Sequence, residues 1–157
     1  MIKVGNIPLW VLLFTNFLSA LIHMLLVSLI IYISAPIIFK ADYPMNPLTY
    51  FLSLLLFIII CIIIGIIIGL IAKKPSTMTM LSQLVFLPSL LLSGIMFPSD
   101  MLPEFFIKVS SIFPATHSIK ILTASNKLTL NLMLPLIIIG VVVVATLVIT
   151  YKKILVD

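Results

Sequence analysis

Four long runs of apolar residues without a single charged side chain constrain this sequence of 157 residues more than any other feature. A helix needs about 20 apolar residues to cross the roughly 30 Å of hydrocarbon in a bilayer, and each run reaches that length. Only a helix satisfies its own backbone hydrogen bonds in lipid, so the runs predict membrane-spanning helices rather than strands. The expected spans are Ile7–Phe39, Thr49–Ala72, Met78–Phe97 and Leu132–Tyr151.

The composition excludes a soluble domain. Hydrophobic residues make up 63% of the chain and charged residues 8%, and the mean hydropathy is +1.42. A soluble domain is about half apolar and about a quarter charged. A chain of this length has too little interior to hide so much apolar surface from water. We therefore expect an all-α polytopic membrane protein with a single membrane domain over residues 1–157.

The basic charge of the chain does not indicate a nucleic-acid partner. The net charge is +5, and all nine basic residues are lysines that stand singly or in pairs near the ends of apolar runs. A phosphate-binding face would cluster them and would usually contain arginine. The pairs Lys73–Lys74 and Lys152–Lys153 lie directly against span ends, where lysine marks the cytoplasmic side. We expect a multi-pass protein of the cell membrane, in contact with the lipid bilayer, with both termini cytoplasmic.

The long loop of residues 98–131 carries a helical pattern of its own. Glu104 and Lys108 lie four residues apart in the order that stabilises a helix, opposite an apolar stripe. The stripe consists of Leu102, Phe105, Phe106, Val109, Ile112 and Phe113.

Prolines divide this outer loop into two short segments. Pro103 suits a first helical turn, whereas Pro114 ends the stripe, and a second apolar stretch covers Ala115–Ala124. The pattern predicts a short amphipathic or re-entrant helical hairpin before the last span, at the outer membrane surface. An exposed amphipathic connector is the alternative interpretation.

A series of punctuating residues surrounds the end of the third span, in the stretches Phe86–Phe106 (FLPSLLLSGIMFPSDMLPEFF) and Ile112–Leu122 (IFPATHSIKIL). In order, they are Pro88, Ser93-Gly94, Phe97-Pro98, Leu102-Pro103 and Pro114. This order resembles the C-terminal signature of type-2 ATP-binding-cassette (ABC) exporter permeases. The four spans are similar to the third to sixth spans of such a six-span permease. Since the first two spans have no counterpart here, the resemblance implies a truncated product, a fragment or half of a split permease.

The resemblance implies a permease subunit that forms the substrate pathway of an ATP-driven exporter. It implies two partners, a separate ABC-type ATPase subunit and another permease in a homo- or heterodimer. Coupling to the ATPase would pass through the cytoplasmic elbows Lys3–Pro8 and Lys73–Thr77. The five glycines cannot form a phosphate-binding loop, so no cofactor is expected in this chain and ATP would bind the partner subunit. The lack of intramembrane charge favours an amphiphilic or hydrophobic substrate.

The ionisable residues predict neither a catalytic nor a metal site. The four acidic residues lie in loops or at the terminus, and none can be paired with another. His23 lies within the first span and His117 in the outer loop, each without a nearby carboxylate or thiol. A hydrogen bond to a neighbouring helix is the simplest interpretation of His23, and a functional role of an intramembrane ionisable group is the second. His117 fits the turn around the last proline of the signature.

Polar residues of the third span are candidates for lining the pathway. They are Gln83, Ser89 and Ser93, and structural packing is the alternative interpretation. Pro88 removes one backbone hydrogen bond, so we expect a kink there and expect the hydroxyl of Ser93 to bond the freed carbonyl.

A stripe of small residues runs along the second span. Cys61, Gly65 and Gly69 recur every four residues, a spacing that lets two helices approach closely. The stripe predicts helix packing, either within one bundle or at a subunit interface.

Two further functions remain as alternatives to the permease. One is a small membrane protein that binds a partner without transport, in a regulatory or self-protection role. The other is a non-functional permease fragment. Either would fit a chain in which the first two spans of the family have no counterpart. An intramembrane enzyme is disfavoured by the absence of paired acids or a nucleophile–base set.

Overall fold

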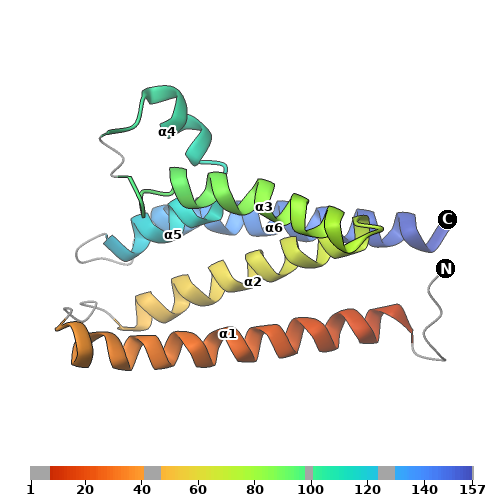
Figure 1. The fold of residues 1–157 in the computed structure, drawn as a ribbon, viewed down its shortest axis with the longest axis horizontal. Helices are drawn as coiled ribbons and strands as arrows, with labels where there is room; N and C mark the ends of the chain where they lie inside the picture. Colours follow the sequence, from red (N-terminus) through yellow and green to blue (C-terminus); the bar gives the residue numbers. More distant parts are fainter. Residues whose placement is uncertain (1–7, 41–46, 98–100, 124–129, 157) are drawn as a thin grey trace. The chain divides into compact units, whose positions relative to one another are not determined.

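The chain folds into helices. A computed structural model describes residues 8–40, 47–97, 101–123 and 130–156, and within these ranges there is no strand. The helices are α1 (Leu9–Phe39), α2 (Pro47–Ile71), α3 (Pro75–Leu92), α4 (Glu104–Ser110), α5 (Pro114–Thr123) and α6 (Leu130–Val156) (Figure 1). In this part of the chain α1, α2, α3 and α6 are long and apolar enough to cross a membrane, which confirms the predicted all-α polytopic fold.

The chain divides into two compact units, Met1–Asp42 and Tyr43–Asp157, called unit 1 and unit 2 below. The single membrane domain expected from the sequence stays a prediction. Unit 1 contains α1, whose 31 residues correspond to about 46 Å of helix. This length exceeds the roughly 30 Å of the hydrocarbon, so the helix must tilt or extend past it. α1 begins at Leu9 with Pro8 in the N-cap position, and Ile7, where the expected span began, lies outside the described residues.

The core of unit 2 lies where α2, α5 and α6 meet. Ile60 of α2, Ile121 of α5, and Met133 and Leu136 of α6 form one buried cluster, in which Leu136 is fully buried. α6 approaches α2 closely at Gly140, because a Cβ atom there would lie 3.6 Å from the side chain of Ile60. These contacts make α2 and α6 the central pair of the unit.

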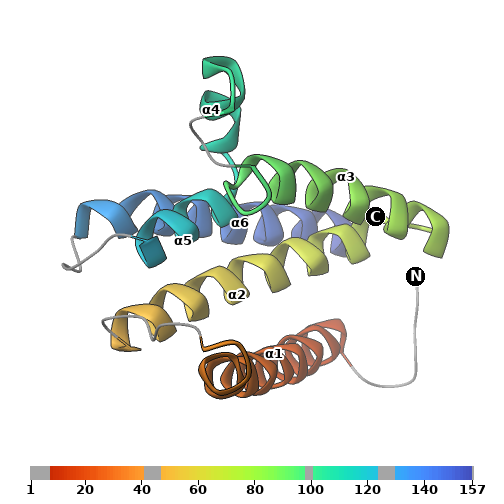
Figure 2. The same ribbon diagram turned by 60° about the vertical axis from the view of Figure 1, so that its left-hand side comes forward.

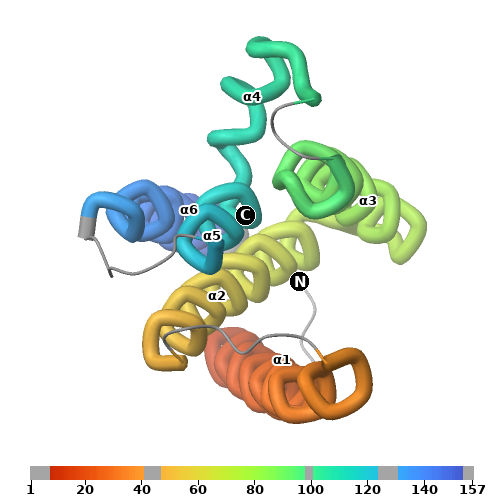
Figure 3. The backbone as a smooth tube through the Cα atoms, turned by 90° about the vertical axis from the view of Figure 1, so that its left-hand side faces the viewer, coloured from red at the N-terminus to blue at the C-terminus, as the bar shows by residue number. Residues whose placement is uncertain are grey.

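α5 enters this core although it is only ten residues long. It packs against both α2 and α6 (Figure 3). α4 instead projects away from α2 and α6 (Figures 2 and 3), and Phe105 is 70% exposed. The predicted helical hairpin before the last span is therefore confirmed, with one arm that dips into the bundle and one that stands outside it.

α3 differs most from the expected span of residues 78–97. It begins at Pro75, because a proline fits the first position of a helix, where no backbone donor is needed. It ends at Leu92, since Gly94 adopts a left-handed conformation with φ of 91° that a continuing helix cannot contain. The apolar residues after Gly94 therefore belong to the loop, although they extend the hydrophobic run of the sequence.

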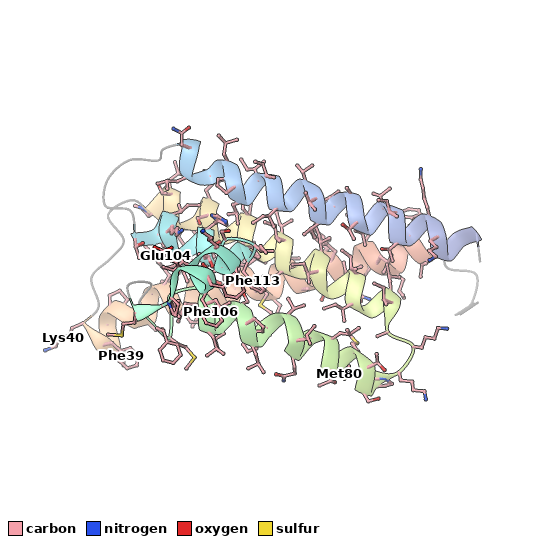
Figure 4. All side chains as sticks on the ribbon, turned by 90° about the horizontal axis from the view of Figure 1, so that it is seen from above. Phe39, Lys40, Met80, Glu104, Phe106 and Phe113 are labelled. Atoms are coloured by element: carbon pink, nitrogen blue, oxygen red, sulfur yellow. The ribbon has the colours of Figure 1, made fainter. Side chains whose placement is uncertain are left out.

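The two ends of unit 2 carry different elements. The turn between α2 and α3 lies at the same end as the C-terminus of α6 (Figure 1). α4 and α5 lie toward the other end, so that Glu104, Phe106 and Phe113 lie far from Met80 of α3 (Figure 4). Lysine pairs therefore mark one end and the helical hairpin the other.

Candidate functional site

The three polar residues predicted to line a pathway do not share one face of α3. Gln83 is exposed, Ser89 is half-buried, and Ser93 is only 4% exposed. Ser89 and Ser93 are one helical turn apart, whereas Gln83 lies six residues before Ser89, which is about 120° around the helix. The structure thus brings the two serines together and leaves the amide of Gln83 on another side. Their role in a pathway stays a prediction.

The hydroxyl of Ser93 has a different partner from the one expected. Pro88 frees the carbonyl of Leu84, four residues earlier, but the Ser93 hydroxyl donates to the carbonyl of Leu90 at 3.1 Å. That carbonyl belongs to the last turn of α3, where no later amide within the helix is available. Ser93 therefore stabilises the end of α3 rather than the interruption at Pro88, because Gly94 ends the helix directly after it.

The residues of the proposed signature lie at helix boundaries. Ser93 and Gly94 end α3, Pro103 stands directly before α4, and Pro114 is the first residue of α5 and is buried. Pro98 lies outside the described residues. These positions mark where α3 ends and where α4 and α5 begin, so they separate α4 and α5 from the span before them.

The comparison with protein families decides what kind of protein carries these elements. The model of the ABC-2 type transporter family matches residues 3–126, which include α1 to α5. The chain belongs to the ABC-2 type transporter family. No curated protein and no solved structure matches the chain. As an ABC-2 membrane domain it is a permease, not itself a catalyst, and the resemblance read from the sequence is confirmed.

The two histidines of this ABC-2 permease have different surroundings. His23 is exposed on α1, on an open groove lined by Thr15, Leu18, Ser19, Ile22, His23 and Leu26. The imidazole Nε2 of His117 lies 2.7 Å from the carbonyl oxygen of Ser111, so it links α5 to the turn after α4. Among the described residues, no group of three or more His, Cys, Asp or Glu side chains could hold a metal ion.

The small-residue stripe of α2 is uncovered over most of its length. Cys61, Gly65 and Gly69 are all exposed, and a Cβ atom at Gly65 would meet no atom within 4 Å. A Cβ atom at Gly69 would lie 3.9 Å from the side chain of Met78. The role of the stripe in helix packing stays a prediction.

Four buried hydroxyl groups on α2 and α5 were missed by the sequence analysis. The side-chain oxygens of Thr49 and Ser53 on α2, and of Thr116 and Ser118 on α5, are buried and have no hydrogen-bond partner. The hint in the sequence was the spacing of Thr49 and Ser53, which stand four apart at the start of an otherwise apolar helix.

Several predicted features fall on residues that the structure does not describe. They are residues 3–7 of the first elbow, residues 41–46 of the first turn, Asp100, Lys127 and Asp157. The second elbow is described: Lys73 and Lys74 are exposed between α2 and α3, and Lys74 is the N-cap residue of α3.

Proposed function

We propose that this ABC-2 permease is the membrane-spanning subunit of an ATP-driven exporter. It dimerises with another permease, forms the substrate pathway and couples to a separate ATPase. The observation that carries the proposal is the family match over residues 3–126, together with the four apolar helices. The substrate class favoured is an amphiphilic or hydrophobic molecule, since the spans contain no charged side chain within their apolar runs.

The ends of unit 2 support an orientation for this subunit. The exposed pair Lys73–Lys74 lies between α2 and α3, and Lys152–Lys153 lies near the end of α6, at the same end of unit 2 (Figure 1). Lysines next to spans favour the cytoplasmic side, because translocating them is unfavourable. This end is therefore the proposed docking face for the ATPase, and the hairpin of α4 and α5 is proposed to lie on the outer side of the cell membrane.

Exposed groups on two helices support a partner permease and a pathway. The small-residue stripe at Cys61, Gly65 and Gly69 allows close approach of a second helix. The amide of Gln83 on α3 is exposed, and an amide in hydrocarbon needs a hydrogen-bonding partner. Lining of a pathway would provide such partners through the substrate or water.

Association with an ATPase tests the proposal directly. The full chain is co-expressed with an ABC-type ATPase subunit, purified through a tag on the permease, and the ATPase is assayed for ATP hydrolysis with and without the permease. We expect the ATPase to co-purify and its hydrolysis rate to rise. The double variant Lys73→Glu/Lys74→Glu should reduce association, whereas Lys108→Glu on α4 should not. Absence of association would favour the small membrane protein that binds another partner without transport.

Cysteine accessibility tests the orientation separately. Cys61→Ala removes the only cysteine, so single cysteines can be placed at Lys73, Lys108 and Lys153. In intact right-side-out vesicles a membrane-impermeant maleimide should label Lys108→Cys, and should label the other two only after the membrane is opened. Labelling of Lys73→Cys in intact vesicles would reverse the orientation and remove the proposed docking face.

A further inference from the structure

Two pairs of lysines stand at the ends of the two central helices of unit 2. Lys73–Lys74 follows the end of α2, and Lys152–Lys153 lies near the end of α6. All four side chains are exposed, and none of them forms an ion pair with another side chain in the part of the chain that the structure describes. In the sequence no acidic residue stands within 25 residues of the first pair; Asp157, four residues after the second pair, lies outside the described residues. This end therefore carries an excess of positive charge.

The two lysine pairs lie at the same level along the bundle. α2 and α6 pack side by side and run in the same direction (Figure 1), and they meet at Gly140, where an added Cβ atom would lie 3.6 Å from Ile60. Lys73 follows Ile60 by thirteen residues, and Lys152 follows Gly140 by twelve. At a rise of 1.5 Å per residue, both lysines lie about 18–20 Å from that contact. The four ammonium groups are therefore carried at one level rather than spread along the helices.

Two tyrosines place this level relative to the membrane. Tyr50 precedes Ile60 by ten residues and Tyr151 follows Gly140 by eleven, so the tyrosines lie about 15–17 Å from the contact in opposite directions. Tyrosine is enriched at both membrane–water interfaces, and the resulting separation of about 32 Å fits a hydrocarbon layer of roughly 30 Å. A bilayer with its headgroups is about 40–45 Å thick, so its surface lies about 20–22 Å from the contact at its middle. The lysines therefore lie at the level of the headgroups.

Lipid phosphates are the oppositely charged groups at this level. Each lysine ammonium offers three hydrogen-bond donors, and its flexible aliphatic stem lets it reach toward the headgroups. A basic residue near an anionic membrane surface raises the binding constant about fivefold. A zwitterionic headgroup gains less, because its own cationic group offsets the charge of the phosphate. The lysine pairs therefore favour anionic lipids over zwitterionic ones.

The helix surface beside the lysines fits acyl chains. Val148 and Ile149 lie one helical turn before the second lysine pair, on the same face of α6. Their side chains are 47% and 67% exposed. A lipid whose phosphate meets these lysines can thus lay its acyl chains on apolar surface, which a free phosphate ion cannot use.

We propose that Lys73, Lys74, Lys152 and Lys153 form one surface that binds the headgroups of anionic phospholipids in the leaflet at this end of unit 2. The surface combines four ammonium groups at one depth with apolar helix surface for the acyl chains. It requires the membrane-spanning fold but neither the proposed ATPase nor the proposed orientation, because the same contacts form in whichever leaflet this end lies.

Lipid selectivity in vesicles that contain no ATPase tests the proposal separately from the proposed docking face. The full chain is reconstituted in phosphatidylcholine with a trace of spin-labelled phosphatidylglycerol or spin-labelled phosphatidylcholine of the same acyl chain. Electron paramagnetic resonance then measures the fraction of each label that the chain immobilises. Averaged over all lipids around the chain, we expect phosphatidylglycerol to bind about twofold more tightly or better, and the preference to fall at high salt. Equal immobilisation of the two labels overturns the proposal.

Inorganic phosphate distinguishes a lipid surface from a site for a free anion. At equal ionic strength, phosphate should lower the preference no more than chloride does. A stronger effect of phosphate would assign the lysines to a free anion and overturn the proposal.

Variants of each pair identify the lysines that are responsible. Lys73→Gln/Lys74→Gln and Lys152→Gln/Lys153→Gln should each lower the preference for phosphatidylglycerol by about half, because each keeps the other pair. Lys108→Gln is the control, since Lys108 stands one turn after Glu104 on α4, and it should leave the preference unchanged. A preference that is unchanged in either paired variant, or lowered as much by Lys108→Gln, overturns the proposal. If one paired variant does not fold, the other decides alone.

Discussion

Leu136→Ala is the most informative single change in the core of unit 2. Leu136 is fully buried between Ile60, Ile121 and Met133, so its truncation leaves a cavity that neighbouring side chains line on all sides. Leu134 is two residues earlier on the same helix and is 48% exposed, which makes Leu134→Ala a control of identical chemistry.

The structure sets the expected size of this effect. In a soluble protein, truncation of a buried leucine costs about 2.7–5.0 kcal/mol, which combines transfer from water with the cavity left behind. Between lipid and a protein core the transfer contribution nearly vanishes, because lipid tails are as apolar as leucine. The cavity contribution remains, and roughly 80 Å³ at ~24 cal/mol per Å³ gives about 2 kcal/mol. Leu134→Ala should cost less than about 0.5 kcal/mol.

Reversible unfolding in bicelles measures both variants under the same conditions. A loss of about 2 kcal/mol corresponds to a Tm lowered by about 4–8 °C for a chain of this size. If Leu134→Ala costs as much as Leu136→Ala, the packing of α6 against α2 and α5 is wrong. If Leu136→Ala costs about 4 kcal/mol or more, the assumption that only the cavity contribution remains in a membrane is wrong. The leucine side chain would then be exposed to water, rather than to lipid, in the unfolded state.

Three further predictions follow from particular positions. Gly94→Ala should lower stability by about 1–2 kcal/mol, because Gly94 has φ of 91°, whereas Gly65→Ala should be neutral or stabilising in the same thermal assay. Gly140→Ala should be tolerated at its 3.6 Å approach, but Gly140→Leu should cost about 1–3 kcal/mol by overpacking, and equal Tm values would contradict this. A polarity-sensitive dye should report a more apolar environment in lipid vesicles at Phe105→Cys than at Lys108→Cys; equal emission would show that α4 does not insert its apolar side.

The spans could be predicted because membrane insertion depends on properties that a sequence displays directly. Length, apolar content and absence of charge are local, and they identify α1, α2, α3 and α6. The end of α3 could not be placed in the same way. Ile95, Met96 and Phe97 are as apolar as the helix before them, so hydropathy extends the span through Gly94. Only the left-handed backbone at Gly94 ends the helix, and hydropathy carries no signal for it.

The burial of α5 is a second feature that local properties do not reveal. The sequence shows a short apolar stretch interrupted by Thr116, Ser118 and Lys120, a pattern that fits a segment at the membrane surface as well as one that dips into it. In the structure Thr116 and Ser118 are buried and Lys120 is exposed, and α5 is packed against α2, α3 and α6. α2 lies more than 40 residues before α5 in the sequence, and α6 follows α5 and packs back against it. Which residues of α5 are buried therefore depends on tertiary packing rather than on the composition of α5.

α2 connects the two ends of unit 2 in one continuous helix. At one end it leads into the exposed Lys73–Lys74 turn, and near its middle Ile60 packs in one cluster with Ile121 of α5. Its 25 residues, about 37 Å of helix, move together unless the helix bends. A displacement imposed at the lysine turn must therefore either carry α5 along or open its contact with α2. Because one buried cluster joins Ile121 of α5 to Ile60 of α2 as well as to α6, opening the contact would separate packed apolar side chains, so α5 should move together with α2.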